Sequence, residues 1–295
     1  MPLLDPPTLR VMTFNVLHDS VRSPLRPWAI RRPHVMETIR EGEAGIVCLQ
    51  EVSPRQLDDF ARDLPEYEIM PGGETGGTIL KGWAVLTRAP ARFVLGEFFD
   101  RGERCPILVR RSLGRCVDTG WTRLESNRTD FAPPHLVNWV RIELPTGRTI
   151  GVYNTHLALV RGRTRGAPRD LLDVIDRQWN GDLQVLAGDF NALPSGPVLR
   201  ALTTRAENGP PPFADTWDQS ESRTGGNGTF HWGLSLPGPR LDYILIRPSC
   251  RVMRTTVARR GFGRNQASDH IAVTSELRPG EPSAGARRQP WPWPG

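Results

Sequence analysis

The sequence LAGDFNALP at residues 186–194 marks the point where an apolar run ends and polar side chains begin. The largely apolar run over 183–187 predicts one buried strand. Asp189 and Asn191 follow it two residues apart, so an extended chain directs both side chains to the same side. A Pro- and Gly-containing turn then predicts a short helix over 198–202. A carboxylate and a carboxamide at a strand end favour a functional site, although the same pair also forms Asx turns that cap helices.

Composition sets broad limits on the class of protein. The chain has 295 residues, of which 38% are hydrophobic and 24% charged, which suits one large α/β or two-layer β domain or two small ones. It has no apolar run of about 18 residues and no basic, then apolar, leader at its start, so we expect a cytoplasmic protein without a membrane partner. The four cysteines are scattered without paired spacing, which argues against a zinc site and a disulfide framework.

The net charge of +6 permits an anionic substrate but does not establish nucleic-acid binding. Lys81 is the single lysine, and the other basic residues are arginines, a bias that is typical of a GC-rich genome. Two arginine-containing stretches, 161–169 and 259–264, are the candidates for a basic groove, although such runs most often form solvated faces.

Polar residues also lie at the ends of other predicted strands. Asn15 lies near the end of a strand over 9–16, and Glu51 follows a largely apolar strand over 45–50. Ser53 and Pro54 then provide the N-cap and first residue of a helix. Each residue has a simple structural explanation, since Asn15 can start a turn and Glu51 can favour a helix N-terminus.

The strand predicted over 151–156 places Asn154 and His156 on one face. The remaining pattern predicts runs of strands with few helices, which favours a two-sheet sandwich over a doubly wound parallel sheet. Residues 207–228 are expected to form a loop, and 252–258 to be the antiparallel neighbour of a strand over 240–246. The other predicted strands are 83–88, 107–110, 116–123, 136–144 and one beginning at 269–270; the other predicted helices follow Pro33 and span 170–179.

The polar residues at these strand ends form one chemical set. Carboxylates and amides are hard oxygen ligands that favour Mg²⁺ or Mn²⁺ over zinc. Histidines beside such a site can donate hydrogen bonds to an anion or move protons near neutral pH. The combination points to metal-assisted hydrolysis of a phosphate ester. The set comprises Asn15, Glu51, Glu103, Asn154, His156, Asp189, Asn191, Asp242, Asp269 and His270.

Six blocks in this order, TFNVL, IVCLQEV, YNTHL, AGDFNALP, RLDYI and SDH, resemble the signatures of the endonuclease/exonuclease/phosphatase superfamily of deoxyribonuclease I-like phosphoesterases. The resemblance covers residues 9–277 and is strongest to compact, bacterial-type members. It implies an α/β fold, a four-layer α/β/β/α sandwich in which two mixed sheets pack face to face and are flanked by helices. We expect a single domain over 1–277 and a disordered, Pro-rich tail over 278–295.

The resemblance also implies roles for the residues near the metal and the attacking water. Glu51 would be the main ligand of a catalytic Mg²⁺, for which Mn²⁺ could substitute. Asn15 and Asp269 would lie close to this ion or to its waters. Asp189 would orient or deprotonate the attacking water, and Asn191 would hold a phosphate oxygen.

A second group would contact the phosphate. His270 would contact the scissile phosphate, and Asp242 would fix its tautomer and favour its charged form. His156 would bind the phosphate from the other side. The residues expected to assist substrate binding are Asn154, Glu103 and Arg161.

The resemblance implies a metal-dependent phosphatase or phosphodiesterase that acts on a small phosphorylated metabolite, such as a nucleotide or sugar phosphate. A nuclease acting on DNA or RNA, or an inactive binding protein of the same fold, are the alternatives. An abasic-site nuclease is disfavoured, because Leu17 stands where those enzymes carry an acidic residue, and their tyrosine block is absent. We expect a monomer.

Overall fold

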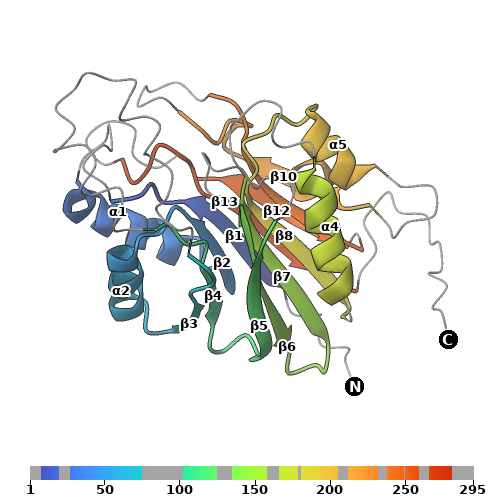
Figure 1. The fold of residues 1–295 in the computed structure, drawn as a ribbon, viewed down its shortest axis with the longest axis horizontal. Coiled ribbons are helices and arrows are strands. Elements are labelled where there is room, and N and C mark those ends of the chain that lie inside the picture. Colours follow the sequence, from blue (N-terminus) through green and yellow to red (C-terminus); the bar gives the residue numbers. More distant parts are fainter. Residues whose placement is uncertain are drawn as a thin grey trace.

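Two β-sheets form the centre of the computed structural model (Figure 1), which describes residues 8–19, 27–74, 102–124, 135–157, 166–178, 181–204, 212–231, 238–248, 250–258 and 266–280. The first sheet has seven strands in the order β10-β12-β13-β1-β2-β4-β3. Its strands are β1 (Leu9–Asn15), β2 (Ile46–Gln50), β3 (Tyr67–Met70), β4 (Ile107–Arg110), β10 (Ser220–Thr224), β12 (Arg251–Val257) and β13 (Val273–Arg278). Because β1 pairs in parallel with β2 and antiparallel with β13, this sheet is mixed.

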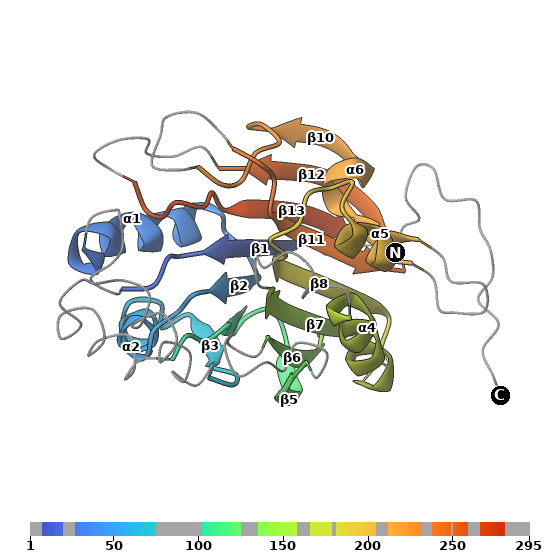
Figure 2. The same ribbon diagram turned by 45° about the horizontal axis from the view of Figure 1, so that its top comes forward.

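The second sheet has six strands in the order β5-β6-β7-β8-β11-β9. Its strands are β5 (Arg115–Arg123), β6 (Leu136–Glu143), β7 (Thr149–His156), β8 (Leu183–Asp189), β9 (Ala214–Asp215) and β11 (Asp242–Arg247). It is also mixed, since β7 and β8 are parallel and β11 is antiparallel to β8. Helices α1 (Trp28–Glu41) and α2 (Pro54–Asp63) lie on one side of the two sheets, and α4 (Ala167–Gln178) and α5 (Pro197–Thr203) lie on the other (Figure 2).

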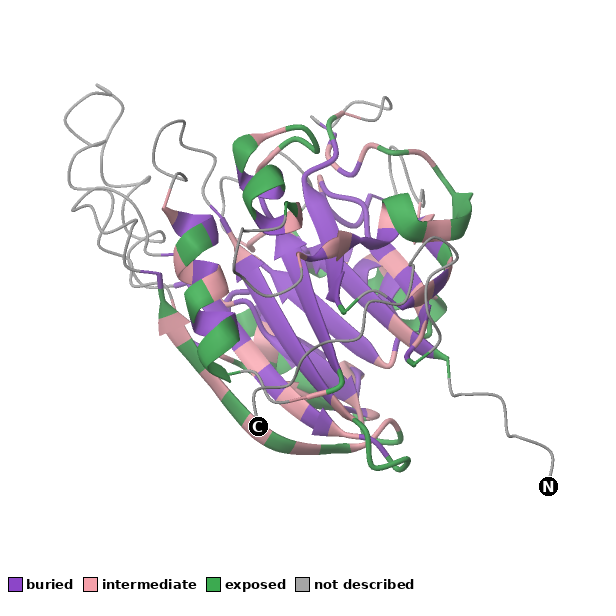
Figure 3. Cartoon of the chain, turned by 90° about the vertical axis from the view of Figure 1, so that its right-hand side faces the viewer, coloured by how far each residue is buried: buried purple, intermediate pink, exposed green. Residues whose placement is uncertain are grey.

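Alternation along the central strands explains this layering. In β1, Val11 belongs to the apolar cluster between the sheets, whereas Met12 and Phe14 face the cluster beneath α1 and α2. In β8, Val185 points between the sheets and Leu186 points toward α4 and α5. Both strands are therefore covered on both faces, and Figure 3 shows central strands that are buried along most of their length. The predicted four-layer sandwich is confirmed.

The strand ends that carry polar residues meet at one edge of the sandwich. Asn15 lies opposite Gln50 at the ends of β1 and β2, and Glu51 follows Gln50 directly. His156 lies opposite Asp189 at the ends of β7 and β8. Asp242, the first residue of β11, lies opposite Asp189 on its other side. Asp189 therefore lies between β7, which carries His156, and β11, which carries Asp242.

The structure corrects two expectations about the carboxy-terminal part of the chain. Residues 252–258 are not the neighbour of the 240–246 strand, because β11 is already paired with β8 and β9, and β12 pairs with β10 and β13 in the other sheet. The predicted loop over 207–228 contains β9, helix α6 (Thr216–Gln219) and β10. This short helix is capped by the carboxylate of Asp215, which accepts a hydrogen bond from the Trp217 N–H.

The starts of α1 and β13 differ by several residues from the prediction. Helix α1 begins at Trp28 and includes Pro33, because buried Trp28 and Arg31 anchor its first turns to the core. Asp269 and His270 precede β13, which begins at Val273. The predicted strand over 83–88, Arg161 and most of the predicted tail lie outside the described residues, although β13 itself extends through Arg278. Among the described helices, none is long and apolar enough to cross a membrane.

Candidate active site

Asp189 is the hub of the polar cluster at the strand ends. Its side chain is 1% exposed, and its Oδ2 atom accepts a hydrogen bond of 3.1 Å from Asn15 Nδ2. The same oxygen lies 3.5 Å from His156 Nε2 and 3.6 Å from His270 Nε2. Its Oδ1 atom accepts a hydrogen bond from the backbone N–H of Asn191. One buried carboxylate therefore faces two imidazole rings and an amide.

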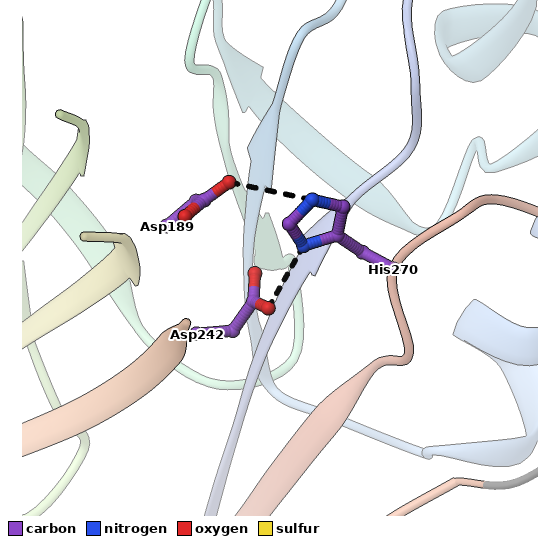
Figure 4. Close-up of side chains that lie close together, drawn as sticks. All are labelled: Asp189, Asp242 and His270. Carbon is purple, nitrogen blue, oxygen red and sulfur yellow. Dashed lines mark hydrogen bonds and ion pairs between the residues drawn. The ribbon is translucent and has the colours of Figure 1, made fainter. Parts of the chain in front are cut away.

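Each of the two histidines is backed by a second carboxylate. Nδ1 of His156 lies 3.3 Å from Oε1 of Glu103, and Nδ1 of His270 lies 2.9 Å from Oδ2 of Asp242. Figure 4 shows the ring of His270 between Asp189 and Asp242. We call Glu103, His156, Asp189, His270 and Asp242 the carboxylate–histidine chain, because acidic and imidazole groups alternate along it.

Electrostatics favours the charged form of both rings. Burial alone would lower the pKa of His156, but the carboxylates of Glu103, Asp189 and Glu51 outweigh it and raise this pKa to about 10. For His270, burial is likewise outweighed, chiefly by Asp242 and Asp189, and its pKa also rises to about 10. Both rings therefore carry a proton on each nitrogen at neutral pH.

The distances leave the inward protons available. Separations of 3.5 and 3.6 Å are longer than a good N–H···O hydrogen bond, so neither Nε2 proton is held tightly by Asp189. A phosphate oxygen is the kind of acceptor that two such imidazolium donors can share. Asn191 belongs to the same rim, since its Nδ2 lies 3.1 Å from His156 Nε2 and donates to the Leu157 carbonyl. With Nε2 protonated, both atoms are donors, so neither accepts from the other and both can face one shared acceptor.

Glu51 has the surroundings of a metal ligand. Its Oε1 accepts a 2.8 Å hydrogen bond from Asn15, and its Oε2 accepts one of 3.3 Å from the His18 N–H. Burial raises the pKa of Glu51, and the nearby carboxylates of Glu103 and Asp269 raise it further against the opposing effect of His156. A divalent cation would relieve this crowding of hard oxygen donors, so the residues present fit Mg²⁺ or Mn²⁺.

Backbone conformation supports the same location. Among the described residues, four non-glycine residues have φ in the left-handed region: Leu17, Glu43, Glu51 and Asn191. Three of them border the cluster, including Glu51 itself at φ 57°. Such conformations cost free energy and persist where the surrounding structure holds them, often at functional sites.

A second grouping of potential ligands has a different explanation. Ligand atoms of Asp189, Asp242 and His270 lie within 4.8 Å of one another, close enough to surround one ion. Both nitrogens of His270 face carboxylates, however, with Nδ1 2.9 Å from Asp242 Oδ2 and Nε2 3.6 Å from Asp189 Oδ2, so each ring nitrogen has an acceptor for a proton. This trio therefore suits proton and phosphate chemistry better than metal binding.

Asn154 does not take the position expected for substrate binding. Its side chain is fully buried and donates to the backbone carbonyls of Leu49, Cys105 and Pro106, while its Oδ1 accepts from Gln50. Asn154 and His156 share a face of β7, but only His156 reaches the end of the strand. The amide of Asn154 instead joins the two sheets beneath the site.

Two residues that the sequence did not single out support the cluster. The hydroxyl of Thr229 donates a 2.6 Å hydrogen bond to Asp242 Oδ2 and accepts from the Asp242 N–H. The hydroxyl of Ser268 donates to the Asn15 carbonyl and accepts from the His270 N–H. Ser268 begins the SDH block. Because its hydroxyl hydrogen-bonds backbone groups, which every residue carries, no spacing in the sequence identifies this role in advance.

Known proteins resemble this chain in family and in fold. The model of the Endonuclease/Exonuclease/phosphatase family matches residues 12–270. No curated protein matches the chain in a sequence search. An endonuclease/exonuclease/phosphatase structure from Bacteroides vulgatus is 22% identical, with a TM-score of 0.76 over 92% of this chain and 98% of its own.

Two further structures share the fold at lower scores. The mannosyl-6-phosphatase of Bacteroides thetaiotaomicron is 22% identical, with a TM-score of 0.71 over 91% of this chain and 99% of its own. TDP2 from D. rerio, complexed with a single-strand DNA product, is 15% identical, with a TM-score of 0.64 over 92% of this chain and 98% of its own. At these identities the likeness concerns the fold.

Proposed function

This chain belongs to the Endonuclease/Exonuclease/phosphatase family, and on that premise we propose that it is a Mg²⁺-dependent hydrolase of phosphate esters. We further propose that its substrate is a small phosphorylated metabolite, of the nucleotide or sugar phosphate class. Family membership supports phosphoester hydrolysis. The metal and the substrate are proposals that rest on the chemistry of the site.

The observation that carries the proposal is the carboxylate–histidine chain centred on Asp189. Hydrolysis of a phosphate ester needs a group that positions water and donors that stabilise the negative charge on the phosphate oxygens. Asp189 would perform the first task by holding a water between its carboxylate and the phosphate, oriented for attack. The two imidazolium rings supply the donors, at 3.5 and 3.6 Å from that carboxylate.

The outer residues of the chain maintain this state. Glu103 and Asp242 hold the outer nitrogens of His156 and His270, which fixes each ring and keeps it protonated. Glu51 would hold the metal ion, with Asp269 beside it, and Asn15 would position Glu51 and Asp189 through its amide. When bound, Mg²⁺ would supply positive charge that stabilises the phosphate as its negative charge develops.

The substrate class draws support from one fold relative. That protein is a mannosyl-6-phosphatase, so the fold accommodates a phosphorylated sugar. The DNA product bound to TDP2 supports the alternative, a nuclease. The two functions differ in whether a monomeric ester or a polymer is cleaved.

The test is hydrolysis of a substrate panel by the full-length protein. The panel contains nucleotides, dinucleotide cofactors, sugar phosphates, lipid phosphates, single-stranded RNA and duplex DNA, each with Mg²⁺, Mn²⁺ or EDTA. Glu51→Ala is the test variant. Glu43→Ala is its matched control, because Glu43 is also a glutamate with left-handed φ but lies on the surface, paired with Arg10.

We expect turnover of a small phosphate ester that is abolished by EDTA and by Glu51→Ala and retained in Glu43→Ala. Cleavage of polymer alone would replace the proposal with a nuclease. Turnover that persists in EDTA and in Glu51→Ala would refute the metal-dependent mechanism. No cleavage of any member by folded protein would refute the proposed substrate classes and favour a binding protein.

A further inference from the structure

Arg31 in helix α1 is a fully buried arginine that lies behind the candidate active site. Its side chain is 0% exposed and is one of the largest fully buried side chains among the described residues. Burial lowers the pKa of Arg31 to about 10, with Asp269, Glu51 and Asp19 opposing that effect, so it stays charged at neutral pH. A buried arginine is costly unless its donors are satisfied, which makes its contacts informative.

The guanidinium of Arg31 donates to four backbone carbonyls from two distant segments. Its Nη1 donates to the carbonyl of Val16 at 2.7 Å and to that of Ala267 at 2.9 Å. Its Nη2 donates to the carbonyls of Leu17 at 2.9 Å and His18 at 3.4 Å. One planar group therefore joins the segment after β1 to the segment before β13.

The first of these segments contacts Asn15 and Glu51 through its backbone N–H groups. The Leu17 N–H donates to Asn15 Oδ1, and the His18 N–H donates to Glu51 Oε2. Leu17 has φ 56°, a conformation that a residue with a branched side chain adopts only when its surroundings impose it. Arg31 supplies that constraint, together with Gln56, whose Nε2 also donates to the Leu17 carbonyl.

The second segment carries residues on the opposite side of the site. Ala267 is followed by Ser268, whose hydroxyl donates to the Asn15 carbonyl and accepts from the His270 N–H. Asp269 lies between Ser268 and His270. A shift of the Ala267 carbonyl would therefore also displace Ser268 and its contacts with Asn15 and His270.

We propose that Arg31 is a positioning residue for the divalent-metal site, locking residues 16–18 against residues 267–270 so that Glu51, Asn15 and Asp269 face one ion. This inference rests on the proposed function, in that it assumes a metal at Glu51. It assigns Arg31 no contact with substrate. The planar fork is required because a lysine ammonium cannot bridge four carbonyls in two segments.

Charge and positioning make opposite predictions for metal affinity. The guanidinium is a positive charge near Glu51 and Asp269, so by Coulomb repulsion alone its removal would tighten binding of a divalent cation. If its hydrogen bonds position the ligands, its removal loosens binding. Changes to residues that orient metal ligands typically weaken metal affinity by roughly 10- to 100-fold.

The experiment measures Mn²⁺ affinity of the full-length protein by electron paramagnetic resonance, without substrate. Arg31→Lys keeps the charge and Arg31→Met removes it. Arg32→Lys is the matched control, because Arg32 is the next residue on helix α1 and pairs with Asp59 and Asp63. We expect both Arg31 variants to bind Mn²⁺ roughly 10- to 100-fold more weakly and Arg32→Lys to match the wild type. Affinity that is unchanged or tighter in folded Arg31→Lys or Arg31→Met would overturn the inference.

Hydrogen exchange separates failure of this inference from failure of the proposed function. In Arg31→Lys, the amides of Leu17 and His18 should exchange faster while those of β7 and β8 remain protected. If the wild type binds no Mn²⁺, the proposed metal site fails, and faster exchange at 17–18 still establishes that Arg31 restrains these residues. Unchanged exchange there would overturn the positioning role whatever the metal result. Arg31→Lys provides both readouts if Arg31→Met does not fold.

Discussion

At the scale of single residues, the paired arrangement of His270 and Asp242 makes a specific kinetic prediction. Their 2.9 Å contact implies that Asp242 acts through the ring of His270. We expect Asp242→Asn and His270→Asn each to lower kcat/KM by about 10²–10⁴-fold, and the double variant to lose little more than the worse single variant. A double-mutant cycle on the identified substrate measures this coupling. Multiplicative losses would show that the two residues act independently.

The two buried histidines of the carboxylate–histidine chain predict how stability depends on pH. In the folded protein, burial alone would lower the pKa of His156 and His270, but the nearby carboxylates outweigh it and raise the pKa from 6.5 to about 10. The unfolded chain releases these protons near pH 6.5, whereas the folded protein holds them until about pH 10. Their contribution to stability is therefore complete below pH 6.5 and is lost as pH rises through about 10.

Urea unfolding in EDTA between pH 6.5 and 10 measures this contribution. We expect the free energy of unfolding of the wild type to fall over this range, and the fall to be smaller in His270→Gln. An equal slope in the two proteins would show that His270 is not held in its charged form by the fold.

Residue periodicity identifies the face of a strand but not the depth at which a side chain lies. Asn154 and His156 share a face of β7, yet one is sealed between the sheets and the other reaches the rim. For this reason the sequence could predict the histidine but misplaced the amide. Arg31 escaped prediction for a different reason, since its acceptors are backbone carbonyls, which every residue carries.

At the scale of elements, Asn154 joins strand β7 of one sheet to β2 and the segment before β4 in the other. Asn154→Ala would remove buried hydrogen bonds that join the two sheets, although the Cys105 and Pro106 carbonyls keep donors from Asn138 and Leu49, and this loss costs about 1–3 kcal/mol. We therefore expect a lower free energy of unfolding by urea, with KM for the substrate unchanged in the folded variant. A raised KM with unchanged stability would restore the substrate-binding role that the sequence suggested.

Strands whose ends carry chemistry were predictable because each combines an apolar run with a polar stop. The runs ending at Asn15, Gln50 and His156 emerged at nearly their predicted positions. Strand pairing was harder to predict, since β12 pairs with β10 and β13 and not with β11, which is paired on both sides by β8 and β9. The short α6 and β10 lie in a polar region whose pattern contains no apolar periodicity, and so they were predicted as a loop.

At the scale of the whole molecule, the four layers follow from the alternation of apolar side chains in β1 and β8. Each strand supplies one face to the core between the sheets and the other to a core beneath helices. Because both faces of these strands are covered, their polar groups lie at the strand ends. Parallel pairing brings the ends of β1 and β2, and those of β7 and β8, to one edge of the sandwich. The site therefore depends on both sheets being held together.

Because both sheets contribute to the site, metal binding should stabilise the entire fold. A ligand that binds the folded state alone adds RT ln(1 + [L]/Kd), about 2.7 kcal/mol at a hundredfold excess over Kd. We expect millimolar Mg²⁺ or Mn²⁺ to raise the Tm of the wild type in scanning calorimetry, and EDTA to reverse the shift. Glu43→Ala should respond like the wild type, whereas Glu51→Ala should not respond. A Tm increase of equal size in Glu51→Ala would place the ion elsewhere, because Glu51 is the proposed main ligand.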